Sequence, residues 1–124
     1  MSGLSVNEKD ALDQARQELT DAIVGQRIVG VDTTEGSDVR LLTESGRVVL
    51  LDGVSDCCAY GEVELIKSLP TVAHVITSVT AEEGSNQETW FILSEGIPVA
   101  SLYATAYESN GYYSYGINVT VVDA

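Results

Sequence analysis

Two adjacent cysteines and a single histidine are the side chains of this sequence best suited to bind a metal or act as a nucleophile. Cys57 and Cys58 follow Asp56, and His74 lies further along the chain. Thiolate, imidazole and carboxylate groups all bind metals, and a thiolate close to an imidazole can attack a substrate. Asp56, Cys57, Cys58 and His74 are therefore weak candidates for a metal site or for the centre of a small hydrolase.

Several features favour a plainer interpretation of these residues. Two cysteines are too few for a disulfide framework, and their spacing matches no known zinc site. The acidic neighbours Asp52, Asp56 and Glu62 disfavour the thiolate form. No P-loop or dinucleotide fingerprint occurs either. We therefore predict reduced thiols, a half-buried His74 on a strand, no catalytic residue, no metal and no cofactor, and the sequence favours a protein that is not an enzyme.

Charge is distributed very unevenly along the chain. The sequence has 6 Lys and Arg residues against 19 Asp and Glu residues, for a net charge of -13. The basic residues all precede Ser68. Binding to nucleic acid and to anionic membranes depends on Lys and Arg, so we expect neither. No apolar run is long enough to span a bilayer and the first residues do not resemble a secretory signal, so we expect a cytoplasmic protein.

Tyrosine is concentrated near the C-terminal end, together with Ser, Asn and Gly. This composition is typical of recognition surfaces, although cross-strand tyrosine pairs can also simply stabilise a hairpin. The sequence predicts an acidic, non-enzymatic protein-binding module whose partner is a host protein or a second copy of the chain. The candidate partner-binding residues are Tyr103, Tyr107, Glu108, Asn110, Tyr112 and Tyr113.

The length of 124 residues predicts one domain, residues 1–124, with an N-terminal helix in residues 1–25 and mainly β-structure in residues 26–124. Ser5 and Glu8 form a capping box that predicts a helix start near Val6, and Gly25 provides a C-terminal cap. Leu12 and Leu19 recur on one helical face, which favours packing against a sheet.

After Gly25 the apolar residues alternate, which indicates strands. Short turns between them favour antiparallel neighbours, and Asn110-Gly111 predicts a hairpin between the last two strands. Glu62–Leu69 could form two helical turns that end at Pro70. The predicted strands are residues 27–33, 39–43, 48–52, 71–81, 89–94, 99–108 and 112–122.

The predicted fold class is α+β. We expect a twisted or rolled antiparallel β-sheet of six to seven strands in a meander, with the N-terminal helix packed on it and a short middle helix. The predicted core residues are Ile28, Val31, Leu42, Val49, Leu51, Val75, Val79, Phe91, Leu93, Val99, Val119 and Val121.

Two short motifs carry a family resemblance: D-C-C at residues 56–58 and E-S-N-G-Y-Y-S at residues 108–114. Together they resemble a family of small uncharacterised proteins of actinobacteria and their phages, a domain of unknown function. The resemblance extends from about Gly25 to Val122 and leaves the N-terminal helix outside. It implies a phage or actinobacterial accessory protein and no activity. A virion structural or decoration component, or the metal-binding protein or hydrolase described above, remains an alternative.

Overall fold

The structure is a computed structural model that describes residues 6–33, 38–53, 59–68, 74–84, 87–108 and 117–123. One helix and nine strands lie within these residues. They are α1 (Val6–Ile23), β1 (Arg27–Asp32), β2 (Asp38–Thr43), β3 (Arg47–Gly53), β4 (Ala59–Ser68), β5 (His74–Val75), β6 (Ser78–Glu83), β7 (Glu88–Ser94), β8 (Ile97–Glu108) and β9 (Ile117–Asp123). The predicted α+β class is confirmed, but the six to seven strands predicted are too few, because nine strands are described.

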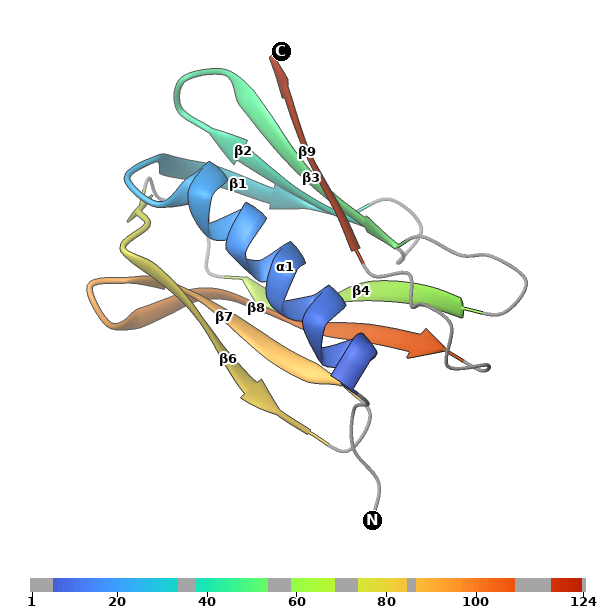
Figure 1. The fold of residues 1–124 in the computed structure, drawn as a ribbon. Helices are drawn as coiled ribbons and strands as arrows, with labels where there is room; N and C mark the ends of the chain where they lie inside the picture. The colour runs from blue at the N-terminus through green and yellow to red at the C-terminus, as the bar shows by residue number, and fades with distance from the viewer. Residues whose placement is uncertain are drawn as a thin grey trace.

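The strands form two antiparallel sheets rather than one (Figure 1). The five-stranded sheet has the order β5-β1-β2-β3-β9, and the four-stranded sheet has the order β4-β8-β7-β6. The predicted pairings of β1 with β2, β2 with β3 and β7 with β8 are confirmed. Glu95 and Gly96 turn the last of these hairpins, with φ of 51° and 82°, as a two-residue hairpin turn requires.

The predicted hairpin between the last two strands is wrong. In the structure β8 lies between β4 and β7, whereas β9 pairs with β3 in the other sheet. Residues 100–104 of β8 have β4 on one side and β7 on the other, so this part of β8 has no hydrogen-bonding edge left for β9. Asn110 and Gly111, which carried the prediction, lie outside the described residues.

One predicted strand, residues 71–81, is divided between the two sheets. His74 and Val75 pair with β1, and β6 pairs with β7. The chain changes sheet at Ile76 and Thr77: Ile76 N–H donates to the Gln26 carbonyl at 3.0 Å, and Thr77 N–H donates to the Leu93 carbonyl at 2.9 Å. This transition lets one continuous segment of the chain contribute a strand to each sheet.

The middle helix predicted at Glu62–Leu69 is also wrong, because residues 62–68 belong to β4. The alternation of exposed Glu62 and Glu64 with buried Val63 is the period of a strand. β4 pairs with β8 along its whole length, with a register shift between Leu65 and Lys67. This bulge places an extra residue, Ile66, in the strand, and the two adjacent apolar residues imitate a helical pattern.

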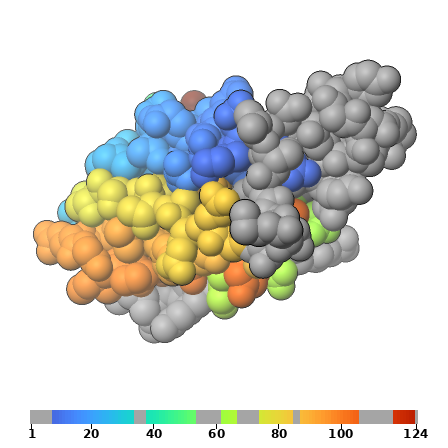
Figure 2. Space-filling model, turned by 60° about the horizontal axis from the view of Figure 1, so that its bottom comes forward, coloured from blue at the N-terminus to red at the C-terminus, as the bar shows by residue number. Residues whose placement is uncertain are grey.

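The helix α1 closes the space between the two sheets. It begins at Val6 as predicted, and Gly25, with φ of 86°, follows its end and donates its N–H to the Ile76 carbonyl at 2.8 Å. α1 contacts β3 and β9 of one sheet and β6 and β8 of the other (Figure 1), and it lies alongside β6 in Figure 2. Ser5, the other half of the predicted capping box, lies outside the described residues.

A single core lies between the sheets and α1. Leu12, Leu19 and Ile23 of the helix are fully buried within it. Within the described part of the chain, no helix combines the length and the apolar character needed to cross a bilayer.

The core prediction is partly confirmed. Ile28, Val49, Leu51 and Val99 are buried, and Val31, Val79 and Val119 pack against the core. Leu42, Val75 and Val121 are instead exposed by 38%, 37% and 47%, and Phe91 and Leu93 are only partly buried.

The errors come from runs of adjacent apolar residues. In such a run, moving the assignment by one residue moves every side chain to the other face of the sheet. β2 buries Leu41 and exposes Leu42, and β7 buries Trp90 and Ile92 in place of Phe91 and Leu93.

Neighbouring leucines in β2 provide a direct test of which face is buried. Leu41 is 1% exposed, so Leu41→Ala should lower the free energy of unfolding by about 2–5 kcal/mol. Leu42→Ala, at a side chain that is 38% exposed, should cost less than about 1 kcal/mol. Urea denaturation at low micromolar concentration measures both. Equal losses would contradict the assigned faces.

Candidate protein-binding face

The outer face of the four-stranded sheet is directed away from α1 and from the core. We call it the Tyr103 face, and it is formed by the alternate residues of β4, β6, β7 and β8 whose neighbours in sequence point inward. Its described members are Glu62, Glu64, Thr80, Glu82, Thr89, Phe91, Ser101, Tyr103 and Thr105.

Tyr103 occupies the centre of a row that crosses all four strands. In register, Glu64 lies on one side of Tyr103, and Thr89 and then Glu82 lie on the other. Neighbouring strands are about 4.8 Å apart, so the backbones of Glu64 and Glu82 lie about 5 Å and about 10 Å from that of Tyr103. Tyr103 is 37% exposed, and Glu64 and Glu82 are exposed. An accessible aromatic ring thus lies between two negative charges.

All charged residues among the described side chains of this face are negative. Glu62 adds a third carboxylate opposite Thr105, and no Lys or Arg is among the described members. Lys67 is in register with Ser101 in the next row. A ring with carboxylates around it is chemically suited to hold Lys or Arg, through cation–π contact and ion pairing.

Of the predicted partner-binding residues, the structure describes the side chain of Tyr103 alone. Tyr107 and Glu108 lie further along β8, in register with Tyr60 and Ala59 of β4. Asn110, Tyr112 and Tyr113 lie outside the described residues. The structure therefore places one predicted residue on an exposed face and two others on the same strand.

The residues proposed for metal or nucleophile chemistry are not brought together within the described residues. His74 lies in β5, is partly buried and pairs in register with Ile28. Asp56, Cys57 and Cys58 lie outside the described residues. Among the His, Cys, Asp and Glu residues that are described, no group of three could hold a metal ion.

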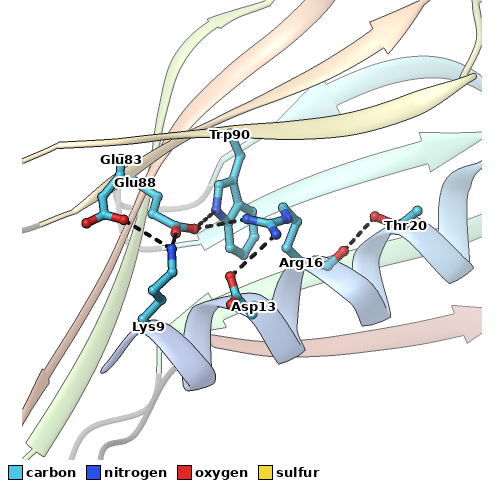
Figure 3. Close-up of polar contacts among 7 residues, drawn as sticks. All are labelled: Lys9, Asp13, Arg16, Thr20, Glu83, Glu88 and Trp90. Carbon is cyan, nitrogen blue, oxygen red and sulfur yellow. Dashed lines mark hydrogen bonds and ion pairs between the residues drawn. The ribbon is translucent and has the colours of Figure 1, made fainter. Parts of the chain in front are cut away.

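A buried ionic cluster between α1 and the four-stranded sheet was not predicted from the sequence (Figure 3). Glu88 begins β7 and its side chain is only 1% exposed. Its Oε1 atom accepts hydrogen bonds from Trp90 Nε1 at 2.9 Å and from Arg16 NH1 at 3.3 Å, and its Oε2 atom lies 3.7 Å from Lys9 Nζ. Both carboxylate oxygens of Glu88 thus face donors or cations, and two of these partners, Lys9 and Arg16, lie on α1, so the cluster anchors the helix.

Lys9 and Arg16 each make a second ion pair at the edge of this cluster. Lys9 Nζ lies 3.0 Å from Glu83 Oε1, and Arg16 NH2 lies 3.4 Å from Asp13 Oδ1. The hydrogen bond to Glu83, followed by its charge, raises the pKa of Lys9 above 10.5. This stabilisation of the fold is complete below pH 10.5 and is lost as the pH rises through the higher pKa of the folded chain.

The sequence contains a spacing pattern that indicates this cluster. Lys9, Asp13 and Arg16 are three or four residues apart, so they share one helical face. Glu88 alternates with Trp90 and so points to the same side of its strand. The unusual feature of the sequence is a glutamate at a core position. Burying its charge is costly unless a cationic side chain from another element pairs with it.

A shallow depression of about 520 Å³ lies at one end of the five-stranded sheet, lined by Gln26, Ser45, Gly46, Arg47 and Asp123. Its two charged groups are paired with each other, with Arg47 Nε 3.3 Å from Asp123 Oδ1. Because the charges are matched, we assign no ligand to it.

These features define an α+β protein of two antiparallel sheets that presents one acidic sheet face. The family model "Domain of unknown function (DUF7448)" matches residues 21–119, and the chain belongs to this family. Most of α1 precedes the matched region. No curated protein and no solved structure matches the chain.

The Glu88 cluster should contribute substantially to stability. Glu88→Gln keeps the shape but removes the charge that Lys9 and Arg16 face, and should cost about 1–3 kcal/mol of unfolding free energy. Glu82→Gln, an exposed change on the opposite face of the same sheet, should stay within about 0.5 kcal/mol. Hydrogen exchange of the α1 amides should accelerate in Glu88→Gln alone. Unchanged exchange would show that Glu88 does not hold the helix.

The absence of a metal centre is a separate prediction. Protein purified without chelators should contain far less than one zinc, iron or copper ion per chain by elemental analysis, because Asp56, Cys57, Cys58 and His74 lack a known ligand spacing. Stoichiometric metal that is lost in a Cys57→Ser/Cys58→Ser variant would overturn this prediction and restore the metalloprotein hypothesis.

Proposed function

We propose that this protein is a non-enzymatic, acidic protein-binding module that takes a basic segment of a partner protein on its Tyr103 face. The observation that carries the proposal is the row across the four-stranded sheet, in which exposed Tyr103 lies between Glu64 and Glu82. Tyrosine is enriched at the centres of protein interfaces, where its ring contributes area and its hydroxyl group remains able to hydrogen-bond.

The charge of the chain supports the choice of partner. A net charge of -13 repels nucleic acid and attracts basic protein surfaces, and it accelerates the encounter with them. On the Tyr103 face a Lys or Arg side chain can lie over the tyrosine ring while its charge pairs with Glu64. Such a contact contributes about 0.5–2 kcal/mol, so several basic residues are needed for a stable complex.

The resemblance to actinobacterial and phage proteins supports an accessory role in the cytoplasm of the host cell. In that setting the partner is a host protein with a basic surface. Tyr107 and Glu108 continue along the strand that carries Tyr103, in register with Tyr60 and Ala59 of β4.

The test compares matched variants in pull-down from actinobacterial lysate with mass spectrometry. Wild-type protein should retain one stoichiometric, basic partner, and Tyr103→Ala/Glu64→Gln should lose it, because both the ring and its adjacent charge are removed. Calorimetry with the isolated partner should show that Tyr103→Ala/Glu64→Gln binds it at least about fivefold more weakly than wild type does. This loss corresponds to about 1 kcal/mol of binding free energy. Circular dichroism confirms that the variant is folded.

The matched control is Glu18→Gln, which removes one exposed charge from α1, far from the Tyr103 face. It should bind like wild type. If Glu18→Gln and Tyr103→Ala/Glu64→Gln weaken binding equally, only the overall charge matters and the proposed face is wrong. A third variant, Tyr107→Ala/Tyr112→Ala/Tyr113→Ala, tests another location. If this variant loses the partner and Tyr103→Ala/Glu64→Gln retains it, the binding site lies at the end of β8 and in the residues after it.

A further inference from the structure

The two sheets have four edge strands among the described residues, and three of them carry features that prevent pairing with another chain. β5 has only two residues. β6 carries exposed Glu82 and Glu83 and lies against α1 (Figure 2). β4 carries exposed Glu62 and Glu64 and a bulge. Short length, charge, coverage and bulges are the means by which natural sheets avoid edge-to-edge association.

The fourth edge, β9, is also contacted by α1, but it is long, regular and almost free of charged residues. It pairs with β3 over seven consecutive positions without a register shift. Its sequence from Ile117 to Val122 contains no charged residue and no proline, and Asp123 is its one ionisable group. Unlike β5, it is long enough to form a ladder of several hydrogen bonds with another strand. β9 is thus a regular, neutral edge in a strongly acidic protein.

The C-terminal half of β9 is also accessible. α1 contacts β9, yet Val121 and Val122 are exposed by 47% and 48%, and Figure 1 shows this end of the strand extending past the helix. Val121 and Val122 point to opposite faces of the sheet, so apolar area is open on both sides of the edge.

An apolar row on the outer face of the five-stranded sheet ends at the same strand. Leu42 pairs with Val48, and Val48 pairs with Val122, so three apolar side chains adjoin across β2, β3 and β9. Leu50 lies in the next row of β3 and is partly exposed. A partner strand added beside β9 would cover Val122 at the end of this row.

We infer that the β9 edge is a self-association interface, at which β9 of a second copy pairs antiparallel with β9 of the first. The two five-stranded sheets then form one continuous sheet with a two-fold axis. An uncharged edge rich in β-branched residues pairs most favourably with an uncharged strand of the same kind. β9 of a second copy is such a strand. The basic segment proposed for the Tyr103 face has no carboxylate to meet along residues 117–122.

The placement of charge favours the antiparallel arrangement. Pairing centred on Val121 puts Asp123 opposite Val119 of the second copy, so the two Asp123 carboxylates lie roughly 13 Å apart along the strands. Parallel pairing in register would put them about 4.8 Å apart. Each Asp123 also keeps its ion pair with Arg47 of its own chain, at 3.3 Å.

The overall charge predicts how this association responds to salt. Two chains of net charge -13 repel each other, and salt screens that repulsion while the apolar contacts persist. Raising NaCl from about 0.05 M to about 0.5 M should therefore increase the dimer fraction. Binding of a basic partner to the Tyr103 face should weaken over the same range, so the two surfaces respond in opposite directions.

Sedimentation velocity over a concentration series tests the inference. Wild-type protein at several hundred micromolar should sediment with twice the 13.2 kDa of one chain. Val122→Lys should shift the apparent dissociation constant at least tenfold toward monomer, because it places a charge in the pairing edge. Val75→Lys is the matched control: Val75 is a 37% exposed valine on β5, at the other edge of the same sheet, and this variant should dimerise like wild type.

A wild-type protein that remains monomeric in high salt would overturn the inference, as would a Val122→Lys variant that dimerises like wild type. If Val122→Lys fails to fold, nuclear Overhauser effects between differently labelled wild-type chains decide the matter. Contacts between β9 residues of the two chains, in antiparallel order, are expected. Contacts that map to the Tyr103 face instead would show association through the other sheet and would refute the β9 interface.

Discussion

A buried carboxylate, Glu88, fixes the position of the element that closes the core. Its donors come from two elements: Trp90 lies in the same strand, and Lys9 and Arg16 lie in α1. Without cationic partners, a glutamate that is 1% exposed would be very costly to bury. The ion pairs therefore specify how α1 is docked, and the fully buried Leu12, Leu19 and Ile23 provide the apolar area that makes docking favourable.

This docking also determines which surfaces are left for binding. Each sheet buries one face against the common core, so its other face becomes the outside of the molecule. Lys9 and Arg16 pair with acids at the inner side of β6 and β7. Arg27, Arg40 and Arg47 lie in the five-stranded sheet and pair with acids there. These five cations therefore pair with acids away from the Tyr103 face, and Lys67, the sixth basic residue, is in register with Ser101 in the row next to Tyr103.

Local patterns predicted the local structure, and they failed where partners are distant in sequence. The capping signals of α1 and the short turns between β1, β2 and β3 act over a few residues, so the sequence alone located them. The choice of sheet for β9, and the buried face of the Trp90-Phe91-Ile92-Leu93 run, depend on residues far away in the chain. Tyr103 was predicted from composition, but its neighbours Glu64 and Glu82 come from strands β4 and β6. No spacing along the sequence shows that they share a row.

The Tyr103 face and the β9 edge belong to different sheets, and this separation has a consequence for affinity. Two copies joined at β9 would each keep an unobstructed Tyr103 face, because that face lies on the four-stranded sheet and takes no part in the pairing. A partner with two basic segments could then engage both faces, and the second contact would form at a high effective concentration. Each face needs only weak affinity under these conditions. In that arrangement the selectivity of binding would come from the spacing of the two faces as well as from the chemistry of each.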